Sequence, residues 1–164
     1  MAPDSFHVLI VCTGNTCRSP MAEVALRKLV AHSGMDAITV SSAGTSGGTG
    51  FPATTFAVEA VKMWELDLNE HESTALTKEL IERADVTLVM TGRHHRHAFS
   101  LAPDSEGNVY LLKEYPDTNP EGGEIDDPIG CSLDVYNSVF LEIGEELGRI
   151  LPILITKAQE KLKV

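Results

Sequence analysis

The chain has 164 residues, of which 43% are hydrophobic, so it is long enough for one compact domain with a buried core. Its 13 basic residues stand against 24 acidic ones, for a formal net charge of −11. This charge disfavours nucleic acid or an anionic membrane surface as the main partner, because both are bound through clustered Lys and Arg. No run approaches the roughly 18 apolar residues of a membrane helix, no basic residue precedes the first apolar run as in a signal peptide, and three cysteines make no secreted disulfide framework. We therefore expect a single domain over residues 1–164, located in the cytoplasm.

The N-terminal part of the chain reads as a strand, a short loop and a helix. Residues 6–11 form an apolar run, apart from His7, that is rich in β-branched side chains, which predicts a strand buried on both faces. Ser19 and Pro20 predict a helix start, with Ser19 at the N-cap and Pro20 in the first helical position. Gly34 is a suitable residue for the end of this helix.

Strands and helices then alternate along the chain. Further strands are predicted at residues 37–42, 85–90 and 109–112, and helices at residues 53–64, 77–84, 93–101 and 132–150. Trp64 has helical spacing with apolar neighbours and is expected in the core. Pro152 removes a backbone donor, so we expect the last helix to end or kink near Ile150 and residues 153–162 to continue in a new direction. The alternation predicts a parallel sheet covered on both faces, with ligands at the carboxyl ends of its strands.

The loop after the first strand carries the residues of an anion site. Gly14 permits a positive φ and Asn15 tolerates one, so successive N–H groups can turn toward one point, and the following helix N-terminus adds positive charge. Arg18 supplies a fork that can grip two phosphoryl oxygens. The same field favours the thiolate of Cys12, which is the nucleophilic form, and Ser19 is close enough to donate a hydrogen bond to the sulfur. The predicted phosphate-binding residues are Thr13, Gly14, Asn15, Thr16, Cys17, Arg18 and Ser19.

A departing group must be protonated when its bond to phosphorus breaks, so a general acid should face Cys12. Asp127, held by Pro128 in the long loop over residues 113–131, is the candidate, and Asp126 is its rival. In the predicted mechanism Cys12 attacks phosphorus while Asp127 protonates the leaving atom. Asp127 then draws a proton from the water that hydrolyses the cysteinyl-phosphate, and Arg18 stabilises the equatorial oxygens. This chemistry requires neither a metal nor a cofactor.

The run from Cys12 to Pro20, with Met21-Ala22-Glu23 behind it, resembles the signature of low-molecular-weight protein tyrosine phosphatases. Ser42-Ala43-Gly44 and Asp127-Pro128 fall where that family has its other signatures, so the resemblance covers essentially the whole chain. It implies a three-layer α/β sandwich of flavodoxin-like arrangement, with a four-stranded parallel sheet and helices on both faces. It also implies Asp127 as the general acid and a phosphorylated protein as the substrate.

Two positions bear on the phosphorylated residue that is recognised. The family commonly has Ile where this chain has Thr16, and an aromatic residue where it has Ile129. The branch of bacterial protein-arginine phosphatases is similar in having Cys-Thr-Gly-Asn-Thr-Cys-Arg-Ser, and the Thr16 hydroxyl could accept a hydrogen bond from a guanidinium. We therefore expect phosphoarginine as the substrate, with phosphotyrosine as the alternative; Ile129 stands where Phe is expected in the arginine branch.

Other interpretations are weaker. Arsenate reductases share the fold and the loop but need further cysteines, and only Cys17 and Cys131 are available. Cys17 itself has two interpretations of equal weight, a reversible disulfide with Cys12 that protects the thiolate or a small buried residue under the loop. The histidines between residues 94 and 97 are interleaved with arginines, which favours a solvated helix start over a metal site.

Overall fold

The computed structural model describes residues 4–163. Its four strands are all parallel and lie in the order β2-β1-β3-β4, as predicted. The chain therefore reverses its direction of winding beside β1, and the loop that follows β1 opens at this switch point, where parallel sheets bind their ligands. The strands are β1 Phe6–Cys12, β2 Ile38–Gly44, β3 Val86–Val89 and β4 Val109–Leu111.

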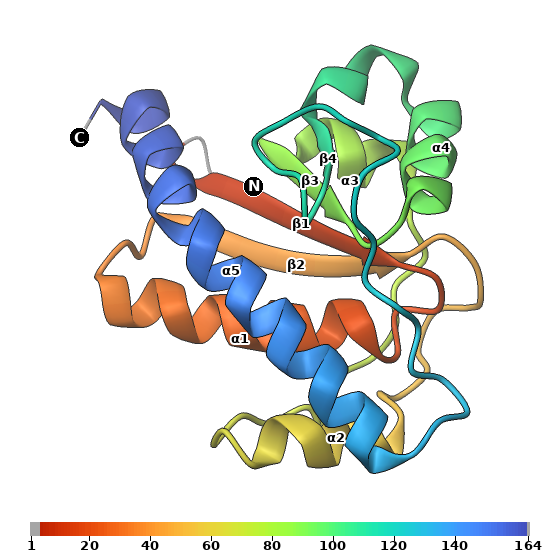
Figure 1. Ribbon diagram of the computed structural model, residues 1–164. Coiled ribbons are helices and arrows are strands. Elements are labelled where there is room, and N and C mark those ends of the chain that lie inside the picture. Colours follow the sequence, from red (N-terminus) through yellow and green to blue (C-terminus); the bar gives the residue numbers. More distant parts are fainter. Residues whose placement is uncertain (1–3, 164) are drawn as a thin grey trace.

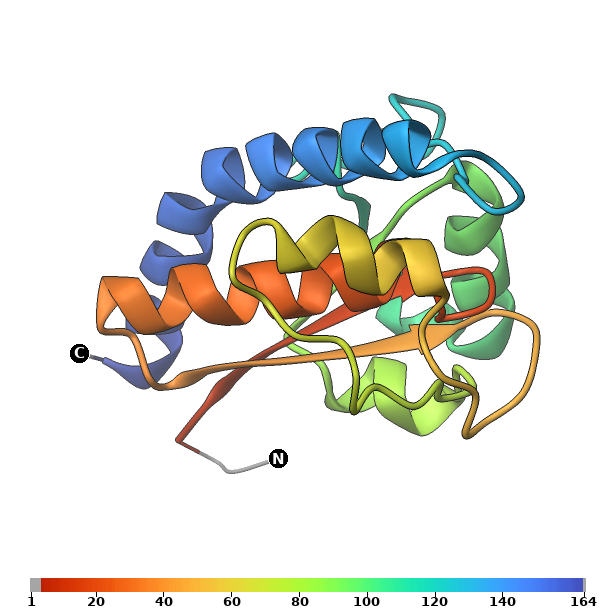
Figure 2. The same cartoon turned by 90° about the horizontal axis from the view of Figure 1, so that it is seen from below.

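Helices cover both faces of the sheet and complete the predicted three-layer α/β sandwich (Figures 1 and 2). One face packs against α1 Arg18–Ser33, α2 Thr55–Lys62 and α5 Leu133–Leu162, and the other against α3 Lys78–Arg83, α4 Gly92–Leu101 and the 3-10 turn η1 Pro103–Asn108. The α5 helix crosses the sheet face next to α1 (Figure 1).

The alternation of β1 side chains supplies both halves of the core. Phe6, Val8 and Ile10 enter the cluster beneath α1 and α5, whereas Leu9 and Val11 enter the smaller cluster beneath α3 and α4. All seven residues of the strand are buried. A strand that is buried on both faces in this way reads as a continuous apolar run, which is why the sequence identified it.

Gly34 and Thr77 mark helix ends as predicted, but Ser19 does not. Gly34 ends α1 in the left-handed conformation at φ 75°, and the Thr77 hydroxyl caps α3 by accepting from the N–H of Leu80. Ser19, however, does not cap α1, so that prediction was wrong. The helix begins at Arg18, the N-cap residue is Cys17, and no side chain caps this end. The Ser19 hydroxyl points into the loop instead, where it contacts Cys12.

The prediction that Trp64 lies in the core was also wrong. The α2 helix ends at Lys62, and Glu65 takes a positive φ of 62° as the chain turns away. Trp64 therefore lies beyond the last helical turn with 53% of its surface exposed, and its ring packs edge-to-face with that of Phe140.

Pro152 does not end the last helix, which runs unbroken from Leu133 to Leu162. Figure 2 shows this helix bending in its C-terminal part, so the expected change of direction is confirmed and the expected end near Ile150 is not. A proline inside a helix removes one hydrogen bond and crowds the preceding turn, and the neighbouring bonds can persist around a bend. Although α5 is 30 residues long, no helix within residues 4–163 is long and apolar enough to cross a membrane.

Candidate active site

The loop between β1 and α1 winds tightly around one point at the carboxyl end of the central strand. Asn15 adopts a positive φ of 56°, as predicted. Gly14 does not, so that part of the prediction was wrong. A Cβ at Gly14 would lie 3.4 Å from Thr16 Oγ1, which is a close but ordinary contact. Asn15 therefore makes the turn, and its short polar side chain suits the left-handed region.

Most carbonyl groups of this loop accept hydrogen bonds from segments that are distant in the sequence. The carbonyl oxygens of Cys12, Thr13, Asn15, Thr16 and Cys17 accept hydrogen bonds from the N–H groups of Thr45, Ser46, Thr54 and Met21 and from the His71 ring. Within the described chain, the backbone N–H groups of residues 13–17 donate to no protein acceptor. Buried N–H groups require a partner. Because their carbonyls are bound elsewhere in the protein, these N–H groups are able to donate to an anion.

Asn15 holds this loop against β2. Its side chain is fully buried; Nδ2 donates to Ser19 Oγ at 2.8 Å and to Ser42 Oγ at 2.9 Å, while Oδ1 accepts from the N–H of Thr74. The Ser42 hydroxyl in turn donates to Glu23 of α1. Every polar atom of the Asn15 side chain is thus satisfied, which fixes the loop conformation.

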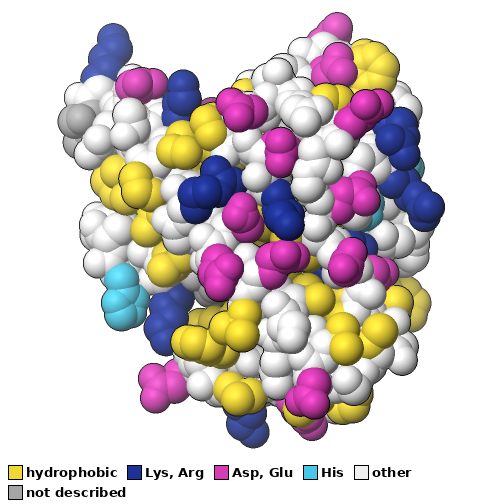
Figure 3. Space-filling view, viewed as in Figure 1, with side chains coloured by type: hydrophobic (Ala, Val, Ile, Leu, Met, Phe, Trp, Pro, Cys, Tyr) yellow, Lys and Arg dark blue, Asp and Glu magenta, His cyan; other side chains and the backbone are white. Residues whose placement is uncertain are grey.

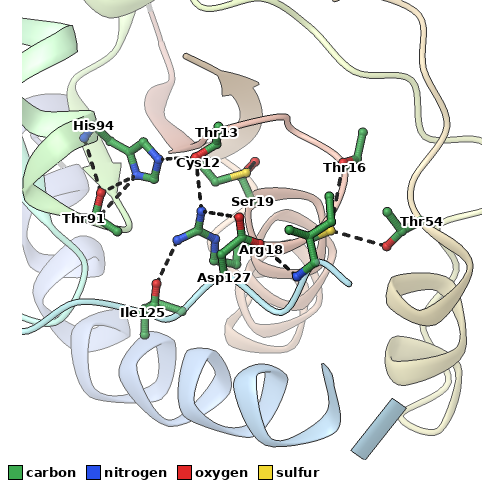
Figure 4. A network of polar contacts seen from close by, with 12 residues as sticks. Cys12, Thr13, Thr16, Arg18, Ser19, Thr54, Thr91, His94, Ile125 and Asp127 are labelled. Carbon is green, nitrogen blue, oxygen red and sulfur yellow. Dashed lines mark hydrogen bonds and ion pairs between the residues drawn. The ribbon is translucent and has the colours of Figure 1, made fainter. Parts of the chain in front are cut away.

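The nucleophile candidate, Cys12, is the last residue of β1 and is 2% exposed. Its Sγ lies 2.9 Å from Ser19 Oγ (Figure 4). Ser19 Oγ accepts from the Asn15 amide, and once Cys12 is a thiolate the sulfur can only accept, so the Ser19 hydroxyl then donates to it. A hydrogen bond of this kind stabilises a thiolate both before attack and when it departs, as the sequence suggested for Ser19.

Arg18, in the first turn of α1, is buried beside the loop with 3% of its surface exposed. Its Nη1 donates to the Ile125 carbonyl at 2.8 Å, and its Nη2 donates to Thr13 Oγ1 at 3.3 Å (Figure 4). Nε is one of the few buried side-chain nitrogens and oxygens in the described residues that have no hydrogen-bond partner. A buried, permanently charged donor without a partner is costly, and an oxyanion in the loop would satisfy it.

The loop over residues 113–131 brings a carboxylate to this arginine. Asp127 Oδ2 lies 3.5 Å from Arg18 Nη2, and Asp127 Oδ1 accepts from the N–H of Ile129 in a tight turn. The Asp127 side chain remains 40% exposed. Its rival Asp126 is also exposed and lines the same cavity of about 370 Å³, but no ion pair joins it to Arg18 within the described chain.

The two predicted specificity positions differ in their surroundings. Thr16 is half-buried, its carbonyl is fixed by the N–H of Thr54, and its hydroxyl lies 4.0 Å from Cys17 Sγ. Ile129 is 59% exposed. Cys17 is buried, and its sulfur lies 3.3 Å from Tyr136 Oη. Tyr136, with its pKa raised to about 12 chiefly by burial, stays a neutral phenol there.

Sequence reasoning missed two contributors to the site. His94 and His95, expected on a solvated helix start, are 1% and 8% exposed, so that prediction was wrong for both. His94 reaches the loop, where its Nε2 lies 2.8 Å from Thr13 Oγ1. Gly44 passes so close to the loop that a Cβ would lie 2.6 Å from the Thr13 carbonyl oxygen. For Gly44, the only indication in the sequence was its place in the family signature Ser42-Ala43-Gly44. No local sequence signal marks His94, which is 81 residues away from Thr13.

Comparison with known proteins places this arrangement in a family. Residues 7–163 match the model of low molecular weight phosphotyrosine protein phosphatases. The chain is 38% identical over 143 residues to a protein-arginine-phosphatase of Bacillus subtilis, covering 87% of this chain and 93% of the relative. It is 39% identical over 145 residues to a probable low molecular weight protein-tyrosine-phosphatase, EpsP, of Ralstonia solanacearum, covering 88% and 93%. The crystal structure of a YwlE mutant from Bacillus subtilis superposes with a TM-score of 0.84 at 37% identity, covering 92% of this chain and 99% of that one. The chain therefore belongs to the low molecular weight phosphotyrosine protein phosphatase family.

Proposed function

We propose that the protein is a phosphoprotein phosphatase that works through a cysteinyl-phosphate and acts on phosphoarginine. The observation that carries the catalytic part is the loop itself. Within the described residues, the five consecutive N–H groups of residues 13–17, directly after Cys12, have no protein acceptor, and the buried Nε of Arg18 has no partner either. These donors match the equatorial oxygens of a phosphoryl group in the transition state.

In the proposed reaction, the Cys12 thiolate attacks phosphorus and the bond from phosphorus to the leaving nitrogen breaks. Asp127 gives that nitrogen a proton, so the departing group is a neutral or cationic guanidine rather than an anion. Water then attacks the phosphocysteine, Asp127 takes its proton, and the sulfur leaves as a thiolate held by the Ser19 hydroxyl at 2.9 Å. Phosphate is released and Asp127 is again protonated for the next cycle.

Phosphoarginine is favoured over phosphotyrosine on three grounds. The 38% identical relative from Bacillus subtilis is a protein-arginine-phosphatase. Thr16 offers a hydroxyl to a substrate N–H, and its strongest competing contact is a sulfur at 4.0 Å. Ile129 provides no aromatic surface for a phenyl ring. The tyrosine alternative rests on the similarity to EpsP, which is of the same extent.

We further propose that the substrate is a phosphorylated protein in the cytoplasm and that the single domain spans residues 1–164. Figure 3 shows Asp and Glu side chains spread over the face around α5 with Lys and Arg among them, and no continuous basic patch on this face. Hydrophobic side chains gather on the same face over α2 and the start of α5. Such a surface suits contact with a protein better than contact with a nucleic acid.

The test compares kcat/KM of the purified protein on one peptide that carries either phosphoarginine or phosphotyrosine at the same position. We expect the phosphoarginine peptide to be hydrolysed faster and Cys12→Ser to abolish turnover while retaining phosphate binding. Thr16→Ile should shift the preference toward phosphotyrosine by about tenfold or more, the scale of an added methyl or a lost hydroxyl contact. A wild-type preference for phosphotyrosine would refute the arginine assignment, and turnover by Cys12→Ser would refute the nucleophile.

A further inference from the structure

A chain of hydrogen bonds leads from the start of α4 into the phosphate loop (Figure 4). Thr91, the N-cap residue of α4, places its N–H and its Oγ1 each 3.2 Å from His94 Nδ1. His94 Nε2 lies 2.8 Å from Thr13 Oγ1. Thr13 Oγ1 also accepts from Arg18 Nη2 at 3.3 Å. This series of hydrogen bonds therefore joins α4 to the phosphate loop and ends on Arg18.

The donors at the start of this chain determine the protonation of the imidazole. A backbone N–H can only donate, so Nδ1 of His94 must accept from Thr91 and carries no proton. The neutral ring then carries its proton on Nε2, which faces Thr13. A second proton would have to sit on Nδ1, against the Thr91 N–H.

The charges around His94 also favour the neutral ring. Burial, Arg18 of α1, and Arg93 and His97 of α4 lower the pKa of His94 to about 4, and Asp127 of the loop over residues 113–131 opposes them only in part. The imidazole is consequently neutral over the whole range in which a cytoplasmic enzyme works.

The same reasoning determines the direction of the Thr13 hydroxyl. Its oxygen has two lone pairs, and these accept from His94 Nε2–H and from Arg18 Nη2–H. Its proton must therefore be donated elsewhere. Thr13 and Arg18 line the same cavity as Asp127, and among the residues described no hydrogen bond offers an acceptor to the Thr13 hydroxyl proton.

We propose that His94 is a positioning residue of the active site, which holds Thr13 Oγ1 as an acceptor for Arg18 and thereby turns the Thr13 O–H toward the phosphoryl group. Thr13 then adds one side-chain donor to the loop N–H groups, and Arg18 Nη2 has an oxygen partner in addition to Asp127. The inference rests on the proposed function, because it assigns a role within the same reaction.

The tests use variants that separate the hydrogen bonds from the packing. In His94→Gln, the side-chain oxygen can still accept from the Thr91 N–H, as Gln does in a capping box, and its NH₂ group can donate toward Thr13. His94→Leu keeps the bulk and removes both bonds, and Thr13→Val removes only the hydroxyl. His97→Gln, on the same helix but outside the chain of bonds, is the matched control.

We expect His94→Leu and Thr13→Val each to lower kcat/KM by about tenfold, the scale of one hydrogen bond to a charged group. The double variant should be no worse than the poorer single variant, because both changes break the same chain. His94→Gln should recover most of the loss, and His97→Gln should resemble wild type. Losses that multiply in the double variant, or a folded His94→Gln that is as impaired as His94→Leu, would overturn the proposal.

Two measurements keep the inference testable apart from turnover. Nitrogen chemical shifts of the imidazoles in the ¹⁵N-histidine-labelled protein at pH 6 should show His94 as the neutral form protonated on Nε2, and a proton on Nδ1 would overturn the assignment. The affinity for inorganic phosphate should fall in Thr13→Val and His94→Leu alike. If the wild-type protein hydrolysed neither phosphopeptide, the proposed function would fail, whereas these two measurements would still decide the role of His94.

Discussion

Gly44 offers a sharp test of how tightly the phosphate loop is built. An added Cβ would lie 2.6 Å from the Thr13 carbonyl oxygen, 2.9 Å from the Asn15 nitrogen and 3.0 Å from the Gly14 carbonyl carbon. All three atoms are backbone, so none can move by a change of rotamer. A carbon and a carbonyl oxygen approach to about 3.3 Å, so Gly44→Ala must displace the loop or β2 by roughly 0.7 Å.

A shift of that size in the group that holds the phosphoryl oxygens should lower kcat/KM by about 100-fold. The free energy of unfolding should fall by about 1–3 kcal/mol, as for other overpacked sites. The assays are steady-state hydrolysis of a phosphopeptide, titration with inorganic phosphate and urea unfolding. The loop should matter more for phosphate binding than for the stability of the fold. The loss of phosphate affinity should therefore be larger than the fraction of unfolded protein in the sample can explain.

Gly148 provides the matched control. It is exposed in α5, and a Cβ there would meet nothing within 4 Å. Gly148→Ala should leave kcat/KM unchanged and stabilise the protein by about 0.5–1 kcal/mol, because alanine is the better helix former. Wild-type activity in a folded Gly44→Ala protein would refute the argument that β2 sets the shape of the loop.

Three further predictions concern the groups around the loop. Asp127→Asn should lower kcat by about 10²–10⁴-fold, the range for a lost general acid, and Asp126→Asn should not; the reverse result in the same steady-state assay would reassign the acid. His94, with its pKa lowered to about 4, resists protonation that the unfolded chain accepts near pH 6.5. The folded state should therefore lose up to about 3 kcal/mol as the pH falls from 6.5 to 4; urea unfolding of His94→Gln over this range should show a shallower loss, and parallel curves would contradict the assignment. If Cys17 protects Cys12 by a disulfide, Cys17→Ala should lose recovery by thiol after peroxide; equal recovery would leave Cys17 as a packing residue.

The elements that the sequence predicted well are those whose signals are local. A run buried on both faces identified β1, and Gly34 and Thr77 marked helix ends through hydrogen bonds within one turn. Ser19 carried the same kind of local signal as Thr77, yet it does not cap its helix, because Cys12 and Asn15 compete for its hydroxyl. A local rule gives way at a functional site, where tertiary contacts decide.

The parts of the site that were not predicted are long-range. Cys12, Arg18 and Ser19 were identified because they lie within eight residues of one another, and their roles stay predictions that the variants above test. Nothing in the local sequence tells that His94 contacts Thr13, since the register of β1 against β3 brings them together. The exposure of Trp64 could not be foreseen either. It depends on where α2 ends, and helical spacing does not show that.

The N–H groups of residues 13–17, which have no protein acceptor among residues 4–163, have a consequence for any solution in which the protein is handled. An anion that completes them binds the folded state and not the unfolded chain, so it raises the free energy of unfolding by RT ln(1 + [L]/Kd). Phosphate, sulfate and vanadate should therefore both raise the melting temperature and inhibit hydrolysis. The anion that inhibits more strongly should also raise the melting temperature more. The ranking of oxyanions by thermal shift would then measure the shape of the loop without any substrate, and buffers free of such ions would reveal the stability of the fold alone.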